Sequence, residues 1–348
     1  MKITAIETIH NKNFSNLVWV KIHTDEGLTG LGETFRNPNA IISYIHESCA
    51  PYLLGKDPLR INEHADNLLN WTANRYIGYP TRSVEYRGNS AIDIALWDLM
   101  GKQVGMPLWR LLGGADPKIK AYAGGIDLMF TEEELLAQTE KNLSSGFRAI
   151  KMKVGRDNLE EDVARIAAMR KHLGKNFPLM VDANMRWTVD EAIRAARAFR
   201  EFDLVWLEEP TIPEDYSGHN RILVEGGVPI SAGENLHTIF DFQHILQANG
   251  VSYIEPDVSN CGGITVWMKV AKLAEAKNLP VTSHGVHDIH VHLLGAVPNA
   301  SYLEVHGFGL ERFILEPLVV KDGFALAGEA PGHGIDFNWD GLCAHTSD

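Results

Sequence analysis

The fold is decided by three short apolar runs that each end near a carboxylate: LMVDAN at residues 179–184, LVWLEEP at 204–210 and VPISAGEN at 228–235. The carboxylates Asp182, Glu208 and Glu234 follow one another at intervals of 26 residues. Short apolar runs between turn residues are typical of strands that are buried on both faces. The intervening segments have helical periodicity. Strand and helix alternating at this spacing predict a parallel sheet or barrel.

These three carboxylates are candidate metal ligands. Parallel strands of a barrel end at one common mouth, so Asp182, Glu208 and Glu234 are expected to lie around one point. Carboxylates that close together repel one another unless a cation lies between them, and ligand sets made only of oxygen favour Mg²⁺. A lone Asp or Glu after a strand is more often a helix cap or a solvated loop residue. Three carboxylates at equal intervals, each at the end of a predicted strand, favour the metal site over these ordinary roles.

Composition limits the class of protein. The chain has 348 residues, of which 45% are hydrophobic and 22% charged, and this is ordinary for a globular protein of one or two domains. A net charge of −13 argues against nucleic acid or an anionic membrane as partner. Cys49, Cys261 and Cys343 are too few and scattered for a disulfide framework. No run approaches the roughly 20 apolar residues of a membrane span. We therefore expect a cytoplasmic protein.

The N-terminal part reads as a small α+β unit. Alternating strands are predicted at 2–9, 17–22 and 31–34, in an antiparallel meander, and helices at 39–54, 59–72 and 89–104. Asn89 or Ser90 is expected to cap the last helix. Asp93 and Asp98 are expected to hydrogen-bond between packed elements. The turn-rich tail from Ile314 is expected to fold back on the meander.

Two loops of this part carry arginines. Arg36 follows the meander, and Arg82 lies in an irregular aromatic segment at 74–88. Each is a candidate substrate contact or simply a structural or surface residue, and the residues alone leave that choice open.

The barrel is expected to continue the same strand rhythm to residue 304. The predicted strands are 119–124, 149–154, 179–182, 204–208, 228–232, 251–256, 279–283 and 301–304. Lys151 and Lys153 share one face of their strand, and on an interior face such charges are costly unless they are used. Asp257, His284 and Glu304 fall at later strand ends.

A histidine cluster offers a competing metal hypothesis. His284, His287, His290 and His292 lie close together in sequence, but only His284 falls at a strand end. Zinc needs ligands that converge tetrahedrally, so satisfied or solvated histidines are the preferred interpretation.

The whole pattern resembles the enolase superfamily, mandelate racemase subgroup. The resemblance spans nearly the whole chain and includes SAIDIALWD at 90–98. The motifs that carry it are Lys151-x-Lys153, Asp182, Glu208 in Glu-Glu-Pro, Glu234 in Gly-Glu-Asn, Asp257 in Pro-Asp, His284 in Ser-His and Glu304 in Leu-Glu. It implies a modified TIM (β/α)7β barrel, an α/β fold, at 116–319. It also implies an α+β capping domain at 1–115 that is completed by 320–348.

By this resemblance, the Mg²⁺ ligands are Asp182, Glu208 and Glu234. Lys153 is implied as a catalytic base, with His284 and Asp257 as a dyad opposite it. Glu304 matches the acid that hydrogen-bonds the substrate carboxylate. Lys151 is expected to act in catalysis by stabilising the negative charge that develops there, and Arg36, Arg82 and Asn184 are further candidate substrate contacts. Like-charge repulsion from Lys151 is expected to lower the pKa of Lys153, and crowding is expected to keep Glu304 protonated.

The branch similarity is to sugar-acid dehydratases and to 3,6-anhydro-galactonate cycloisomerases. It rests on GGIDL at 124–128, ENLHT at 234–238 and SNCGG at 259–263. The segment at 11–15 is shorter than the flap of racemases, which disfavours a bulky apolar substrate. We predict a lyase that removes the proton α to a carboxylate and eliminates the β-hydroxyl of a sugar acid. A cycloisomerase and a 2-hydroxy-acid racemase or epimerase are the alternatives.

Two further alternatives lie outside this chemistry. A sugar-acid sensor would have little need of Lys153 together with the His284–Asp257 pair, and a metal-dependent aldolase would not need two opposed proton-transfer groups. By analogy with the family we also expect a homo-oligomer.

Overall fold

The computed structural model of the chain describes residues 1–76, 83–306 and 308–344. The predicted antiparallel meander is present as β1 (Ile3–Ile9), β2 (Leu17–Thr24) and β3 (Thr29–Phe35), paired in that order. It packs on helices α1 (Pro38–Tyr44), α2 (Ala50–Leu53), α3 (Ile61–Tyr76) and α4 (Val84–Val104), with α5 (Leu108–Leu111) leading out. Gly32 permits close packing, because a Cβ there would lie 2.0 Å from the Ala91 carbonyl oxygen of α4.

Helix α4 starts earlier than predicted. Asn89 and Ser90 are buried within it and do not cap it. Their polar atoms are satisfied by tertiary contacts instead: Asn89 Oδ1 accepts from Tyr44 Oη, and Ser90 Oγ accepts from the Gly262 amide. Packing against the barrel thus overrides the local capping preference.

The prediction for the two α4 aspartates is confirmed. Asp93 accepts hydrogen bonds from the Thr265 amide at 2.9 Å and from Thr265 Oγ1 at 2.6 Å, joining the cap to helix α11 of the barrel (Ile264–Ala276). Asp98 accepts from the Leu31 amide of β3 at 2.9 Å and from Lys102. Asp93 therefore joins α4 to the barrel, and Asp98 joins α4 to β3 within the N-terminal part.

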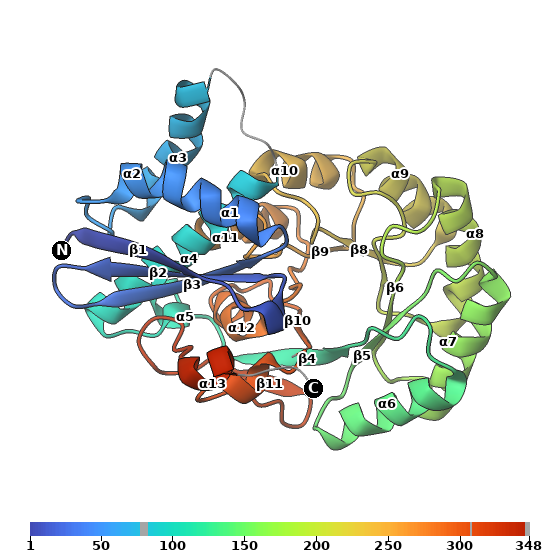
Figure 1. Ribbon diagram of the computed structural model, residues 1–348. Coiled ribbons are helices and arrows are strands. Elements are labelled where there is room, and N and C mark those ends of the chain that lie inside the picture. Colours follow the sequence, from blue (N-terminus) through green and yellow to red (C-terminus); the bar gives the residue numbers. More distant parts are fainter. Residues whose placement is uncertain (77–82, 307, 345–348) are drawn as a thin grey trace.

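The second sheet is the predicted parallel barrel (Figure 1). Its strands are β4 (Lys118–Gly124), β5 (Ile150–Lys153), β6 (Leu179–Asp182), β7 (Leu207–Glu208), β8 (Ile230–Ala232), β9 (Tyr253–Ile254) and β10 (Tyr302–Val305). Strand β10 pairs with β4, which closes the circle on one side. The outer helices are α6 (Glu132–Ser144), α7 (Leu159–Leu173), α8 (Val189–Phe199), α9 (Tyr216–Arg221), α10 (Ile239–Gln247), α11 and α12 (His287–Gly295).

The strand predicted at 279–283 is reduced to single bridges at Val281. This residue bridges Ile254 on one side and Ala300 on the other, so the chain still closes the barrel there. Pro280 has no N–H to donate, which limits a regular ladder at this position. The predicted strands at 204–208, 228–232 and 251–256 are likewise shorter in the structure.

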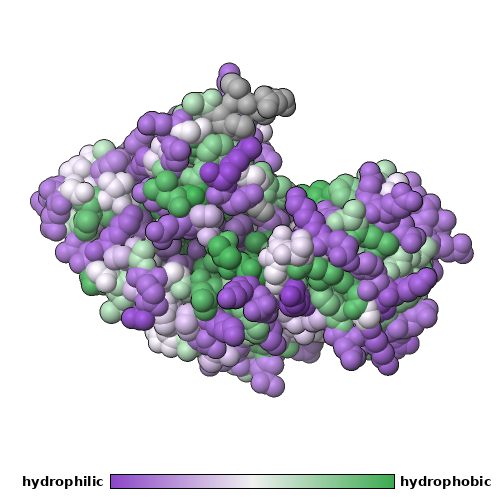
Figure 2. Space-filling model, turned by 90° about the horizontal axis from the view of Figure 1, so that it is seen from below, coloured by the Kyte–Doolittle hydropathy of each residue, from purple (hydrophilic) through white to green (hydrophobic). Residues whose placement is uncertain are grey.

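The C-terminal segment packs against the meander. Phe313, Ile314, Phe337 and Leu342 form one apolar cluster with Trp19 and Leu31. β11 (Phe324–Leu326) also pairs antiparallel with β4, and α13 (Trp339–Ala344) ends the described chain. The face seen in Figure 2 is mostly hydrophilic at its periphery, with hydrophobic residues gathered toward its middle. None of the described helices has the length and apolar character needed to cross a membrane.

Candidate active site

Three carboxylates converge at the mouth of the barrel. Asp182 ends β6, Glu208 ends β7, and Glu234 lies two residues after β8. Asp182 and Glu208 are register partners, and one oxygen from each of the three carboxylates lies within 4.8 Å of the others. All three are buried. The sequence spacing of 26 residues thus corresponds to one βα unit of the barrel, as predicted.

The donor atoms fit a hard divalent cation. The three candidate ligands offer only carboxylate oxygens. Glu234 Oε2 is buried and accepts no hydrogen bond from any described residue, although His284 Nε2 lies 3.2 Å away. An all-oxygen set of this kind suits Mg²⁺ and lacks the sulfur and nitrogen donors of structural zinc sites.

Two lysines of β5 occupy one side of this point. Lys151 is buried, lies 2.8 Å from Glu304 Oε1, and also contacts Glu208. Lys153 contacts Asp182. The two ammonium groups point into the same mouth, as their spacing on the strand predicts.

The predicted pKa direction for Lys153 is wrong in this structure. Burial is the largest single effect and lowers the pKa of Lys153, and the charge of Lys151 lowers it further, but the charges of Asp182 and Glu208 together with the hydrogen bond to Asp182 outweigh both. The net pKa of Lys153 is raised. The pKa of Lys151 is also well above its usual value, since Glu208 and Glu304 outweigh burial. The carboxylates, rather than lysine–lysine repulsion, control both ammonium groups.

His284 stands opposite the lysines. Its Nδ1 lies 2.8 Å from Asp257 Oδ2, and its Nε2 points to Glu234. Burial lowers the imidazole pKa, but Glu234, Asp257 and Glu304 raise it to about 10. Burial raises the pKa of Asp257, yet the hydrogen bond and charge of His284 leave it below its ordinary value. Both shifts describe an imidazolium held by a carboxylate.

Glu304 departs from the prediction. Its Oε1 contacts Lys151, and its Oε2 accepts from the Gly285 amide at 3.0 Å. Burial raises the carboxyl pKa, but Lys151 and His306 hold it well below the ordinary value. Glu304 is therefore an ionised acceptor here, not the protonated donor that crowding alone predicts.

The predicted substrate-binding residues Arg36, Asn184 and Arg82 differ in where the structure places them. Arg36 lines the pocket, and its Nη1 donates to Asn235 Oδ1 at 3.3 Å. Asn184 donates its backbone N–H to Asp182 Oδ1 at 2.8 Å and its side-chain amide to Asp182 Oδ2 at 3.3 Å, so it orients a predicted metal ligand. Arg82 lies outside the described residues.

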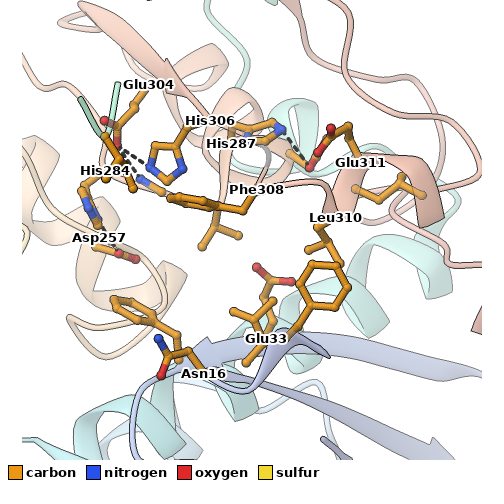
Figure 3. A pocket seen from close by; sticks show the side chains of 18 of the residues that line it. Asn16, Glu33, Asp257, His284, His287, Glu304, His306, Phe308, Leu310 and Glu311 are labelled. Carbon is orange, nitrogen blue, oxygen red and sulfur yellow. Dashed lines mark hydrogen bonds and ion pairs between the residues drawn. The ribbon is translucent and has the colours of Figure 1, made fainter. Parts of the chain in front are cut away.

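A cavity of about 530 Å³ opens over this centre (Figure 3). Lys153, His284 and Glu304 line its floor. The meander and the loops around it add Phe14, Glu33, Phe35 and Arg36 to the wall, and the C-terminal segment adds Ile314, Ile335 and Phe337. Cap, barrel and tail therefore all contribute to one site.

Sequence reasoning missed two polar residues of the mouth. His306 Nε2 lies 3.3 Å from Glu304 Oε2, and it follows Glu304 by two residues, which is the same strand-face signal that identified the lysine pair. Glu209 is buried and accepts from Asn235 Nδ2 at 2.9 Å, beside Glu234. In the sequence, Glu209 directly follows Glu208 in the run LVWLEEP at 204–210, and this position could have identified it as a residue of the mouth.

The other histidines of this segment each have a polar neighbour, as expected, although the buried Nδ1 of His292 has no hydrogen-bond partner among the described residues. His290 Nε2 accepts from the Val258 amide at 3.1 Å, and His292 Nε2 lies 3.1 Å from the His333 carbonyl oxygen. His287 lies 3.3 Å from Asp288. The four histidines at 284–292 do not converge on one point.

Comparison with known proteins covers both parts of the chain. The mandelate racemase/muconate lactonizing enzyme N-terminal domain matches residues 2–113, and the enolase C-terminal domain-like family matches residues 134–341. A 3,6-anhydro-α-L-galactonate cycloisomerase from Streptomyces coelicolor is 48% identical over 332 residues, which cover 94% of this chain and 90% of that protein.

Two solved structures resemble the whole chain. A racemase from Streptomyces coelicolor A3(2) with bound magnesium has a TM-score of 0.91 and 44% identity, with 98% of each chain covered. An L-talarate dehydratase from Polaromonas sp. JS666, complexed with Mg and L-glucarate, has a TM-score of 0.89 and 31% identity, with 97% of this chain and 95% of that chain covered.

Proposed function

This chain belongs to the enolase superfamily, in the mandelate racemase branch, and from that premise we propose that it is a Mg²⁺-dependent cycloisomerase of an anhydro sugar acid of the 3,6-anhydro-galactonate type. The observation that carries the proposal is the placement of Lys153 and His284 on opposite sides of three convergent carboxylates. The 48% identical cycloisomerase supports this choice over dehydration.

Asp182, Glu208 and Glu234 would hold the ion. When bound, Mg²⁺ supplies positive charge to the substrate carboxylate and so increases the acidity of its α C–H. Lys151, which is buried at the same point, adds a second fixed positive charge for the developing negative charge. Asn184 holds Asp182 in position through two hydrogen bonds.

The chain's own groups then move two protons. Lys153 removes the proton from C2 as a neutral amine, a state that would require the bound ion to offset the charge of Asp182, which raises the pKa of this lysine. His284 gives a proton to the oxygen that leaves C3. Two groups on opposite sides of one substrate permit an anti elimination. Asp257 holds His284 through Nδ1, so Nε2 is the nitrogen that faces the reacting atoms.

The leaving oxygen decides between isomerisation and dehydration. In a 3,6-anhydro sugar acid, the oxygen on C3 is also bonded to C6. Breaking the C2–H and C3–O bonds therefore opens the ring without loss of an atom, and the resulting enol becomes a 2-keto-3-deoxy acid. In an open-chain sugar acid the same two steps release water.

The wall of the cavity favours the cyclic substrate. Phe14, Phe308 and Leu310 line it together with the polar floor. An anhydro ring presents C–H groups where an open-chain acid presents hydroxyls. Placing a C–H group against apolar side chains costs less free energy than placing a hydroxyl there, because the hydroxyl loses its hydrogen bonds to water. Dehydration remains the second candidate, supported by the similarity to an L-talarate dehydratase.

The test is incubation of the Mg²⁺-saturated protein in deuterated water with 3,6-anhydro-L-galactonate and, separately, with galactarate. We expect a keto acid of unchanged composition, apart from solvent deuterium, from the anhydro acid. Loss of water from galactarate as the faster reaction would replace cycloisomerase with dehydratase. Exchange at C2 with no keto acid would indicate racemisation, and the absence of any reaction would overturn the catalytic proposal in favour of a sensor. Asp288→Asn, which alters a different pocket carboxylate, is the matched control for folding and metal loading.

A further inference from the structure

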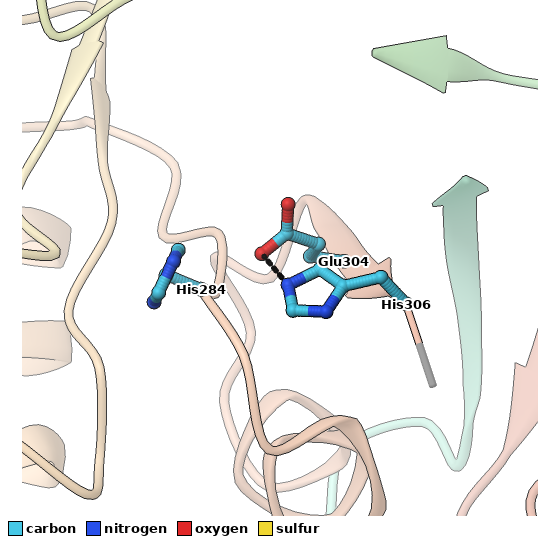
Figure 4. Close-up of side chains that lie close together, drawn as sticks. All are labelled: His284, Glu304 and His306. Atoms are coloured by element: carbon cyan, nitrogen blue, oxygen red, sulfur yellow. Dashed lines mark ion pairs between the residues drawn. The ribbon is translucent and has the colours of Figure 1, made fainter. Parts of the chain in front are cut away.

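Three side chains outside the carboxylate triad form a second group of candidate metal ligands (Figure 4). His284, Glu304 and His306 each offer one ligand atom, and these atoms lie within 4.8 Å of one another. His306 Nε2 lies 3.3 Å from Glu304 Oε2. In a tetrahedral zinc site with bonds of roughly 2.0–2.2 Å, neighbouring ligand atoms are about 3.4 Å apart. His306 Nε2 and Glu304 Oε2 are therefore already as far apart as two ligands of one zinc ion, and only His284 needs to move closer to them.

The backbone presents these groups from two neighbouring barrel segments. Glu304 belongs to β10, and His306 follows it by two residues, so both side chains point to the same side. His284 comes from the adjacent segment after Val281. Two histidines and a glutamate are a donor set that zinc uses when it keeps a fourth position open. Here that position opens to the cavity.

Two of the three side chains, His284 and Glu304, have outer contacts of the kind found around zinc ligands. His284 Nδ1 lies 2.8 Å from Asp257 Oδ2, which leaves Nε2 for a metal and increases its basicity. Glu304 Oε2 accepts from the Gly285 amide at 3.0 Å, which fixes its orientation. His306 packs against Phe308, with ring centroids 4.4 Å apart, and its buried Nδ1 has no hydrogen-bond partner among the described residues.

Charges around the group are mixed. Lys151 Nζ lies 2.8 Å from Glu304 Oε1 and opposes a cation. Glu234, 3.2 Å from His284 Nε2, and Asp257 favour one. Glu304 therefore has one oxygen, Oε1, paired with Lys151, and the other, Oε2, directed toward His306.

We propose that His284, Glu304 and His306 bind one zinc-type transition-metal ion at a site separate from the three-carboxylate centre. Nitrogen donors select such ions over Mg²⁺. Under the proposed function, the bound ion would hold His284 Nε2 and so block proton transfer, which makes Zn²⁺ an inhibitor that excess Mg²⁺ does not displace.

The test uses Co²⁺ as a spectroscopic substitute for Zn²⁺, added to the full chain in excess Mg²⁺. We expect one equivalent to give the strong visible absorption of tetrahedral cobalt, and Zn²⁺ to remove it. His306→Gln should lower the affinity by at least about 100-fold, since loss of an outer contact alone costs about 10- to 100-fold. His306→Cys should restore a tetrahedral spectrum with a thiolate band. His287→Gln, which alters a cavity histidine outside the group, should leave it unchanged.

Absence of the tetrahedral band in the unaltered protein, or its persistence in His306→Gln at undiminished affinity, would overturn the site. A failure of His306→Cys to restore binding would also count against it. The readout requires no turnover, so it is independent of the substrate and reaction proposed above. If the band appears while Zn²⁺ leaves sugar-acid turnover unchanged, the binding site stands and the assigned role of His284 in catalysis falls.

Discussion

Replacing Asp257 with Asn tests how the histidine of the site is held. Asp257 Oδ1 accepts from the amide and hydroxyl of Ser259, and its Oδ2 lies 2.8 Å from His284 Nδ1. An asparagine can keep the Ser259 bonds through its carbonyl oxygen while it places an N–H group against Nδ1. That change forces Nδ1 to accept a hydrogen bond, so a neutral imidazole must carry its proton on Nε2.

The expected loss follows from this geometry. A hydrogen bond to a charged group contributes roughly 1.5–3 kcal/mol. Each 1.36 kcal/mol corresponds to a factor of ten in rate, so loss of the bond alone costs about 10- to 150-fold. Loss of a correctly protonated acid–base group extends the range to about 10⁴-fold. We expect kcat to fall by about 10²- to 10⁴-fold with a much smaller change in KM.

Steady-state kinetics and NMR of histidine-labelled protein measure both consequences. The pKa of His284, about 10 in the structure, should fall in Asp257→Asn because the bond and the charge of Asp257 both raise it. Asp288→Asn is the control, since Asp288 lies beside His287 rather than His284. A turnover rate for Asp257→Asn within fivefold of the unaltered protein, with a folded NMR spectrum, would refute the assigned role of the dyad.

Three further predictions concern the base, the metal and pH. Lys153→Ala should abolish deuterium exchange at C2 from one face, as followed by proton NMR of the substrate; undiminished exchange would remove Lys153 as the base. Chelation of divalent ions should abolish turnover and lower the thermal unfolding midpoint, and Mg²⁺ should restore both; activity that survives exhaustive chelation contradicts the metal assignment. Burial raises the pKa of Asp93 to about 7 from 3.8, against the lowering effect of its Thr265 hydrogen bonds. Because the folded pKa is the higher one, the stability contributed by its protonated form is lost as pH rises from about 4 to 7. Asp93→Asn should therefore gain up to about 4 kcal/mol relative to the unaltered protein over this range in urea unfolding, and a pH-independent difference would contradict the shift.

The barrel and the convergence of its three carboxylates were predictable because they depend on local periodicity. Asp182, Glu208 and Glu234 end apolar runs at a constant interval, and parallel strands bring such ends together whatever the detailed packing. The shared orientation of Lys151 and Lys153 could be predicted because side chains two residues apart on a strand point to the same face. The same repeat applied to Glu304 would have found His306.

Charge states and strand lengths were not predictable in the same way. The pKa of Lys153 depends on the distance to Asp182, and that of Glu304 depends on Lys151 and His306, which come from other strands. Sequence spacing shows which groups are near one another but not which contact is shorter. The reduction of the 279–283 strand to Val281 likewise depends on how neighbouring segments meet at the barrel seam.

The packing of the last residues against the first has a consequence for biosynthesis. Trp19 and Leu31 leave the ribosome long before their apolar neighbours Phe337 and Leu342. This surface of the nascent meander therefore stays uncovered until those later residues have been synthesised. A chaperone that shields exposed apolar strands would therefore find a long-lived target at Trp19 and Leu31, and chains stalled before residue 313 would remain targets for proteolysis.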